Sequence, residues 1–198
     1  MSKIGIFFGT ESGTTRLIAK RIAKALTRRL GEMVVAKPLN VNRIEPEDLG
    51  AFEALILGTP TYGDGVLPGQ PNGTKESSWA EFLPRLAGQD LSGIRVALYG
   101  LGDQETYPKH FLDAMSDLHA CFAGLGAEML GSWPVEGYAF ERSRAVRDGR
   151  FLGLALDQHL QHLLTDQRIE AWLDDLAPRL LPGLKVAAAD PALRASHP

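Results

Sequence analysis

Cysteine is almost missing from this sequence, since Cys121 is the only one among 198 residues. A single cysteine excludes an internal disulfide bond and any zinc or iron–sulfur site built from several cysteines. Because Cys121 falls in an apolar stretch with helical spacing, we expect it to be a core residue. A chain without disulfides fits the reducing cytoplasm.

The sequence also lacks a basic excess and a long apolar run. A formal net charge of −3, without clustered Arg and Lys among aromatic residues, argues against a nucleic-acid-binding protein. No apolar run approaches the roughly 20 residues of a membrane-spanning helix, and the N-terminus shows no signal-peptide pattern. Because His110, His119, His162 and His197 lack the spacing of metal ligands, we expect no metal site.

The charge that is present is unevenly distributed. Residues 16–29 contain six bases and no acid, whereas residues 61–113 contain seven acids against four bases. We therefore expect a basic outer face on the first helix and one negative end of the molecule. The bases are Arg16, Lys20, Arg21, Lys24, Arg28 and Arg29, and the acids are Asp64, Glu76, Glu81, Asp90, Asp103, Glu105 and Asp113.

Apolar runs alternate with amphipathic stretches along the chain. This alternation is typical of an α/β protein with a doubly wound parallel sheet, and the length suits one domain over residues 1–183 with a mobile tail over residues 184–198. An insertion at about residues 132–150 is expected to split or flank the fifth strand. Strands are predicted at residues 4–8, 33–36, 54–58, 94–100, 127–131 and 151–156, and helices at residues 16–30, 77–86, 108–124 and 165–180.

The loop after the first strand has the composition of a phosphate-binding site. Hydroxyl side chains and a glycine stand where a strand turns into a helix, and the first N–H groups of a helix attract an anion. The loop lacks the spacings of a nucleoside-triphosphate cradle and of a dinucleotide fingerprint, which leaves a site for one terminal phosphate. A helix cap without a ligand is the alternative. The residues are Thr10, Glu11, Ser12, Gly13, Thr14 and Thr15.

Two further loops of unusual composition follow the third and fourth strands. Because the carboxyl ends of parallel strands meet at one edge of the sheet, the three loops should form one site. Tyr62 and Tyr107 could hold a flat aromatic ring between them, unless both are ordinary surface residues. The loop residues are Thr59, Pro60, Thr61, Tyr62, Gly63, Asp64 and Gly65 in one and Leu101, Gly102, Asp103 and Tyr107 in the other.

Several segments, in order and over about residues 2–180, resemble the flavodoxins, specifically the long-chain type found with nitrogen-fixation systems. The resemblance implies a sheet with strand order 2-1-3-4-5 in three layers and a non-covalent FMN, whose phosphate lies on residues 10–15 and whose ring lies between residues 59–65 and 101–107. The segments are residues 7–15, 57–65, 79–84, 99–104, 107–108, 131–133, 136–138 and 153–157.

The resemblance also implies a function in electron transfer. Gly63 matches the position whose carbonyl turns toward flavin N5 and favours the neutral semiquinone. Asp64, Asp103 and Glu105, without Lys or Arg in the same loops, would lower the second potential, so the semiquinone/hydroquinone couple would donate single electrons. The implied partners are redox proteins with basic patches, with nitrogenase reductase as acceptor and a flavin or iron–sulfur reductase as donor, and the protein is expected to be a cytoplasmic monomer and not an enzyme.

Two other functions compete with this interpretation. An FMN-dependent NAD(P)H:quinone reductase shares the fold, but no second nucleotide motif is present. A response-regulator domain would need paired acids after the first strand, which are absent. The sequence departs from the family pattern after Asp157, where His159 and Leu160 replace an acid and an Asn, so the family's contacts at that point are not carried over to these two residues.

Overall fold

A parallel sheet runs through the centre of the structure, a computed structural model that describes residues 3–184. Neighbouring strands pair in the order β2-β1-β3-β4, and β5 and β9 both pair with β4, which confirms the predicted order 2-1-3-4-5. The strands are β1 (Ile4–Phe8), β2 (Leu39–Asn40), β3 (Ala54–Pro60), β4 (Arg95–Gly102), β5 (Glu128–Leu130) and β9 (Leu154–Asp157).

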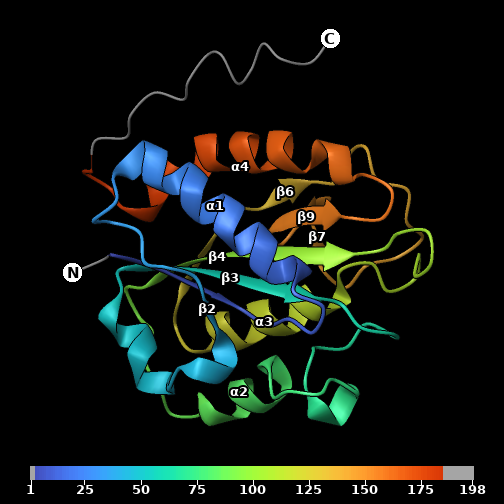
Figure 1. Ribbon diagram of the computed structural model, residues 1–198, viewed down its shortest axis with the longest axis horizontal. Helices are drawn as coiled ribbons and strands as arrows, with labels where there is room; N and C mark the ends of the chain where they lie inside the picture. The colour runs from blue at the N-terminus through green and yellow to red at the C-terminus, as the bar shows by residue number, and fades with distance from the viewer. Residues whose placement is uncertain (1–2, 185–198) are drawn as a thin grey trace.

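Helices cover both faces of this sheet (Figure 1). The helices α1 (Thr14–Leu30) and α4 (Thr165–Leu180) lie on one face, and α2 (Trp79–Arg85) and α3 (Asp113–Gly124) lie on the other. Successive strand residues point to opposite faces, so Ile56 packs in the core under α1 and α4 while Leu57 packs in the core under α2 and α3. A strand covered on both sides must be apolar throughout, which explains the unbroken apolar runs.

In the described part of the chain, four short 3-10 turns complete the connections: η1 (Val41–Arg43), η2 (Pro46–Ala51), η3 (Gln70–Asn72) and η4 (His162–Leu164). Within residues 3–184, none of the helices has the length and apolar character needed to cross a bilayer. The predicted tail over residues 184–198 lies outside the described part of the chain, apart from its first residue.

The second strand lies further along the chain than predicted. Residues 33–36 contribute only Val35, which forms an isolated bridge with Ile4, and Met33 is 79% exposed. The ladder resumes at β2, where Leu39 pairs with Phe7. Pro38 has no N–H group to donate, so it interrupts the pairing between the two points.

The fifth strand is split in two by the insertion, which is one of the two arrangements that the sequence predicted. β5 pairs with the first half of β4 and β9 with the second half. Between them the chain forms a small antiparallel sheet of β6 (Trp133–Pro134), β7 (Val146–Arg147) and β8 (Arg150–Phe151). The prediction that Phe151 begins the resumed strand is wrong, because this residue belongs to β8 and the strand resumes at Leu154.

Aromatic residues fasten the insertion to the rest of the molecule. The rings of Tyr138, Phe140 and Phe151 surround Phe111, with centroid distances of 5.8, 5.5 and 5.8 Å. The Tyr138 hydroxyl donates a hydrogen bond of 2.6 Å to the carbonyl of Ala155 in β9. The insertion is therefore packed against the fifth strand.

Three helix starts differ from the predicted ones. α1 begins at Thr14 rather than at residue 16, so Thr14 and Thr15, which were predicted as loop residues, are the first two residues of the helix. Residues 108–112 form turns, and α3 begins at Asp113, because Leu112 has a left-handed backbone with φ of 61°. Phe111 and Leu112 are fully buried nevertheless, which is why the apolar pattern resembled a helix. The N-cap of α2 is Ser78 rather than Ser77, and its N–H donates to the Glu81 carboxylate at 2.9 Å.

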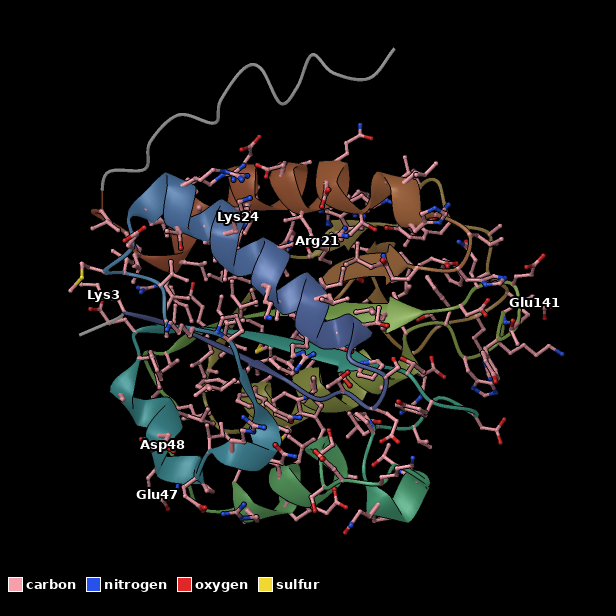
Figure 2. All side chains as sticks on the ribbon, in the orientation of Figure 1. Lys3, Arg21, Lys24, Glu47, Asp48 and Glu141 are labelled. Atoms are coloured by element: carbon pink, nitrogen blue, oxygen red, sulfur yellow. The ribbon has the colours of Figure 1, made fainter. Side chains whose placement is uncertain are left out.

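The outer side of α1 is basic, with Arg21 and Lys24 exposed (Figure 2), but Arg29 is an exception to the prediction. Only 5% of Arg29 is exposed, and its guanidinium contacts Glu170 at 2.7 Å and Asp174 at 2.8 Å on α4. Burial by itself lowers the pKa of Arg29, but hydrogen bonds with the two acids outweigh it and raise the pKa above its ordinary value. Arg29 joins the two helices instead of facing the solvent.

Candidate functional site

Three loops meet at the carboxyl edge of the sheet, as the sequence predicted. β1, β3 and β4 are neighbours and end on the same side (Figure 1). The N–H group of Thr61, just after β3, donates to the carbonyl of Leu101 in β4 at 2.9 Å. We call residues 10–15 the phosphate loop, residues 61–66 the ring loop and residues 103–107 the third loop.

The phosphate loop turns sharply into α1 through a left-handed glycine. Gly13 has φ of +87° and is the N-cap residue, and its N–H donates to the Thr10 hydroxyl at 2.9 Å. The Ser12 and Thr14 hydroxyl oxygens are 3.2 Å apart. The first N–H groups of the 17-residue helix have no preceding carbonyl to bind, so they and the helix dipole favour an anion at this point.

Buried groups from β3 and β4 support the phosphate loop from below. The hydroxyl of Tyr99, which is fully buried, donates to the carbonyl of Thr15 at 3.0 Å. Burial raises the pKa of Tyr99 well above its ordinary value, so the phenol stays protonated and remains a donor. The carbonyl of Gly58 accepts from Gly9 N–H at 3.0 Å and from the Trp79 indole N–H at 2.8 Å.

Tyr99→Phe is expected to weaken binding of a phosphate-bearing ligand several-fold and to cost about 1 kcal/mol of unfolding free energy. The variant keeps the ring but removes the hydrogen bond that holds Thr15. Tyr138→Phe is a matched control, because it deletes the same kind of bond on β9. Isothermal titration of FMN would show the effect, and equal affinities for the two variants would contradict it.

The ring loop has a bonded base and a free tip. Tyr62 and Val66 exchange hydrogen bonds of 3.0 and 2.9 Å, and Gly65 N–H also donates to the Tyr62 carbonyl at 3.0 Å. Gly63 and Asp64 form the exposed tip, and a Cβ atom at Gly63 would meet nothing within 4 Å. Thr59 and Pro60, which were predicted as part of this loop, lie in β3, and Thr59 is fully buried.

Tyr62 brings the ring loop to the phosphate loop. The pKa of Tyr62 lies above its ordinary value. Burial and the charge of Glu11 raise this pKa more than a hydrogen bond with the Glu11 backbone lowers it. The Glu11 carboxylate accepts a bond of 3.1 Å from the N–H group of Lys75. Among the described residues, the buried hydroxyl of Thr61 has no hydrogen-bond partner. A ligand that supplies polar atoms would suit this loop.

The third loop is shaped by Asp103. Its carboxylate accepts from the N–H groups of Glu105 at 3.1 Å and Thr106 at 2.8 Å, and Tyr107, 42% exposed, donates its N–H to the Asp103 carbonyl at 3.0 Å. Partial burial raises the pKa of Asp103, but these bonds and the charge of His159 hold it below the ordinary value. Leu101 and Gly102, predicted as loop residues, are the last residues of β4.

A buried carboxylate that the sequence analysis did not select orders the third loop and the segment that follows β9. Asp157, 1% exposed, accepts hydrogen bonds from the N–H and side-chain amide of Gln104 at 3.2 and 2.7 Å, and from the N–H groups of His159 and Leu160 at 2.8 and 2.9 Å. Because backbone groups of residues 159 and 160 make the contact, their departure from the family pattern leaves it intact.

Fewer acidic residues are exposed at the carboxyl edge of the sheet than predicted. Asp64 and Glu105 are exposed there, whereas Asp90 precedes β4 and so lies at the opposite edge. Asp113 is 1% exposed and contacts Arg144 of the insertion. Arg144 donates to the carbonyl of Gly65 at 3.0 Å, so one cation reaches the ring loop from a segment far along the chain.

A cleft of about 400 Å³ lies on the β2 side of the phosphate loop, away from the other two loops. Arg16, Arg43 and Lys75 contribute positive charge to its lining. These cations come from three separate segments, and Glu11 and Glu76 line the same cleft.

Comparisons with known proteins agree with this geometry. The family model described as flavodoxin matches residues 6–172. A flavodoxin of Klebsiella pneumoniae is 47% identical over 181 residues, covering 91% of this chain and 100% of the relative, and flavodoxin 1 of Escherichia coli is 37% identical, covering 91% and 96%. The crystal structure of a Fusobacterium nucleatum flavodoxin bound to flavin mononucleotide has a TM-score of 0.78 and 30% identity, covering 90% of this chain and 99% of that one.

Proposed function

The chain belongs to the flavodoxin family, and we propose that it is a low-potential carrier that transfers single electrons through one bound FMN. Flavodoxins are electron-transfer proteins and not enzymes. The observation that carries the proposal is the convergence of the phosphate loop with two tyrosine-bearing loops at one edge of the sheet. We further propose that residues 1–183 are a single FMN-binding domain.

The residues at this edge fit FMN. The phosphate loop would hold the phosphate through the N–H groups at the start of α1 and through its hydroxyls. The ring loop and the third loop would hold the ring, with Tyr62 and Tyr107 as its aromatic neighbours. The buried Thr61 hydroxyl, which has no partner among the described residues, is suited to bind a polar atom of the ligand. When bound, FMN supplies reversible one-electron chemistry.

The protein residues would adjust this chemistry through position and charge. We assign to the Gly63 carbonyl the role of accepting a hydrogen bond from the reduced ring, because the exposed tip of the ring loop has room to turn. Asp64 and Glu105 disfavour additional negative charge near the ring, which lowers the potential of the second electron. Arg144 does not cancel this effect, since it pairs with Asp113 and Asp117.

We propose that the same acidic edge docks redox proteins that carry basic patches. Nitrogenase reductase is the proposed acceptor and a flavin or iron–sulfur reductase the proposed donor. Such encounters are weak, small in area and sensitive to salt. A monomer in the cytoplasm suits this role, since the carrier must diffuse between the two partners.

Reduced protein is expected to pass electrons to nitrogenase reductase in stopped-flow mixing, at a rate that falls with salt. Asp64→Asn removes one docking charge and should slow association roughly 2- to 5-fold at low salt. Glu32→Gln is the matched control, because Glu32 is exposed and follows α1 at the opposite edge. Steady oxidation of NAD(P)H by the protein alone would favour the quinone reductase instead.

A further inference from the structure

The insertion reaches the ring loop through one arginine. Arg144 donates from Nη2 to the carbonyl of Gly65 at 3.0 Å and from Nη1 to the Asp117 carboxylate at 2.9 Å. Its backbone N–H donates to the Asp113 carboxylate at 2.6 Å. The guanidinium thus joins the insertion to the ring loop and to α3.

A buried carboxylate holds this arrangement in place. The Asp113 side chain is 2% exposed and contacts Arg144 Nε at 3.5 Å and His110 Nδ1 at 3.1 Å. Gly65 lies directly against it, since a Cβ atom at Gly65 would be 2.8 Å from Cβ of Asp113. Three segments that are distant in sequence therefore meet at the base of the ring loop.

We propose that Arg144, held by Asp113, is a positioning residue that fixes the base of the ring loop at Gly65, so that movement is confined to the Gly63–Asp64 tip. The inference rests on the proposed function as an FMN carrier. The base is anchored by Arg144 and by the bonds between Tyr62 and Val66, whereas at the exposed tip a Cβ atom added to Gly63 would meet nothing within 4 Å.

This division has a consequence for ligand binding and reduction. A loop that is already ordered at its base loses less conformational freedom when it closes on a ring, so affinity is higher. Without Arg144, the base of the ring loop would have to become ordered each time the ligand binds or is reduced. Lysine would not replace it, because a single ammonium group lacks the planar fork that contacts Gly65 and Asp117 together.

Hydrogen exchange in the FMN-free protein tests the anchoring directly. In Arg144→Gln and Arg144→Lys, the amides of Gly65 and Val66, which donate to the Tyr62 carbonyl, should exchange at least about 10-fold faster. Arg142→Gln is the matched control, since Arg142 is exposed in the same insertion and its side chain donates to the Lys109 carbonyl at 3.4 Å rather than to the ring loop. Unchanged exchange in both Arg144 variants would overturn the proposal.

The FMN-loaded protein provides the second measurement. The dissociation constant of FMN should rise roughly 10-fold in both Arg144 variants. If the affinity falls 10-fold only in the one-electron-reduced complex, the potential of the first electron should fall by about 59 mV. If the dissociation constants of the Arg144 variants equal that of Arg142→Gln, or if Arg144→Lys binds FMN as tightly as the unmodified protein, anchoring of the ring loop by Arg144 does not determine FMN affinity. If no variant and not even the unmodified protein binds FMN, the proposed function fails, while the exchange result still decides the anchoring.

Discussion

Gly58→Ala is expected to be among the most damaging single substitutions in this protein, with a loss of roughly 3 kcal/mol of unfolding free energy and much weaker FMN binding. A Cβ atom at Gly58 would lie 1.9 Å from Cζ and 2.2 Å from the hydroxyl of Tyr99. Tyr99 is fully buried, and protein interiors are packed too closely for a buried ring to move aside without cost. Relief of the clash requires displacement of β3 or of the tyrosine.

The size of the loss follows from what moves with Tyr99. Overpacking a core costs typically about 1–3 kcal/mol, and losing the bond from Tyr99 to Thr15 adds about 1 kcal/mol. The same displacement disturbs the Gly58 carbonyl, which binds both Gly9 and Trp79. Because Thr15 belongs to the phosphate loop, affinity for FMN should fall together with stability.

Urea unfolding of the FMN-free protein would measure the first effect and FMN titration the second. Gly124→Ala is the control, because a Cβ atom at that position, the last residue of α3, would meet nothing within 4 Å. It should leave stability unchanged or raise it by up to about 1 kcal/mol. Combining Gly58→Ala with Tyr99→Leu should cost less than the sum of the two single changes, and strict additivity would contradict the clash.

Much of the architecture could be predicted from the sequence because its signals are local. The run Ala54–Pro60 is apolar at nearly every position, as a strand covered on both faces requires, and the hydroxyl-rich phosphate loop directly precedes an amphipathic helix. The alternation of such segments fixed the positions of three loops at one edge. The second strand was misplaced because a single proline decides where the pairing with β1 resumes.

The supports of the site could not be predicted, because they connect residues that are far apart in the chain. Tyr99 binds Thr15 across 84 positions, and Arg144 binds Gly65 across 79. Neither pair has a spacing or composition that distinguishes it from ordinary core or surface residues. Asp113 was counted as a surface acid for the same reason, although the fold buries it against the insertion.

Asp157→Ala is expected to cost about 3–5 kcal/mol, because it removes the acceptor of four hydrogen bonds at the end of β9. The bonds come from Gln104, which follows β4, and from the backbone of His159 and Leu160. Gln104 is 2% exposed and its side-chain carbonyl accepts from the N–H of Ala139 in the insertion at 2.5 Å. Loss of the carboxylate should therefore loosen the third loop and the insertion together.

Three variants separate this effect from simple loss of charge or of a side chain. Asp157→Asn keeps one acceptor oxygen and should lose about half as much unfolding free energy as Asp157→Ala. His159→Ala keeps the backbone N–H that donates to Asp157 and loses an exposed contact with Glu105 at 3.4 Å, so it should lose less than about 1 kcal/mol. Chemical denaturation gives the three free energies, and amide exchange at Gln104 and Leu160 locates the change. A loss for Asp157→Ala no larger than that for His159→Ala would mean that the four bonds do not hold the two loops.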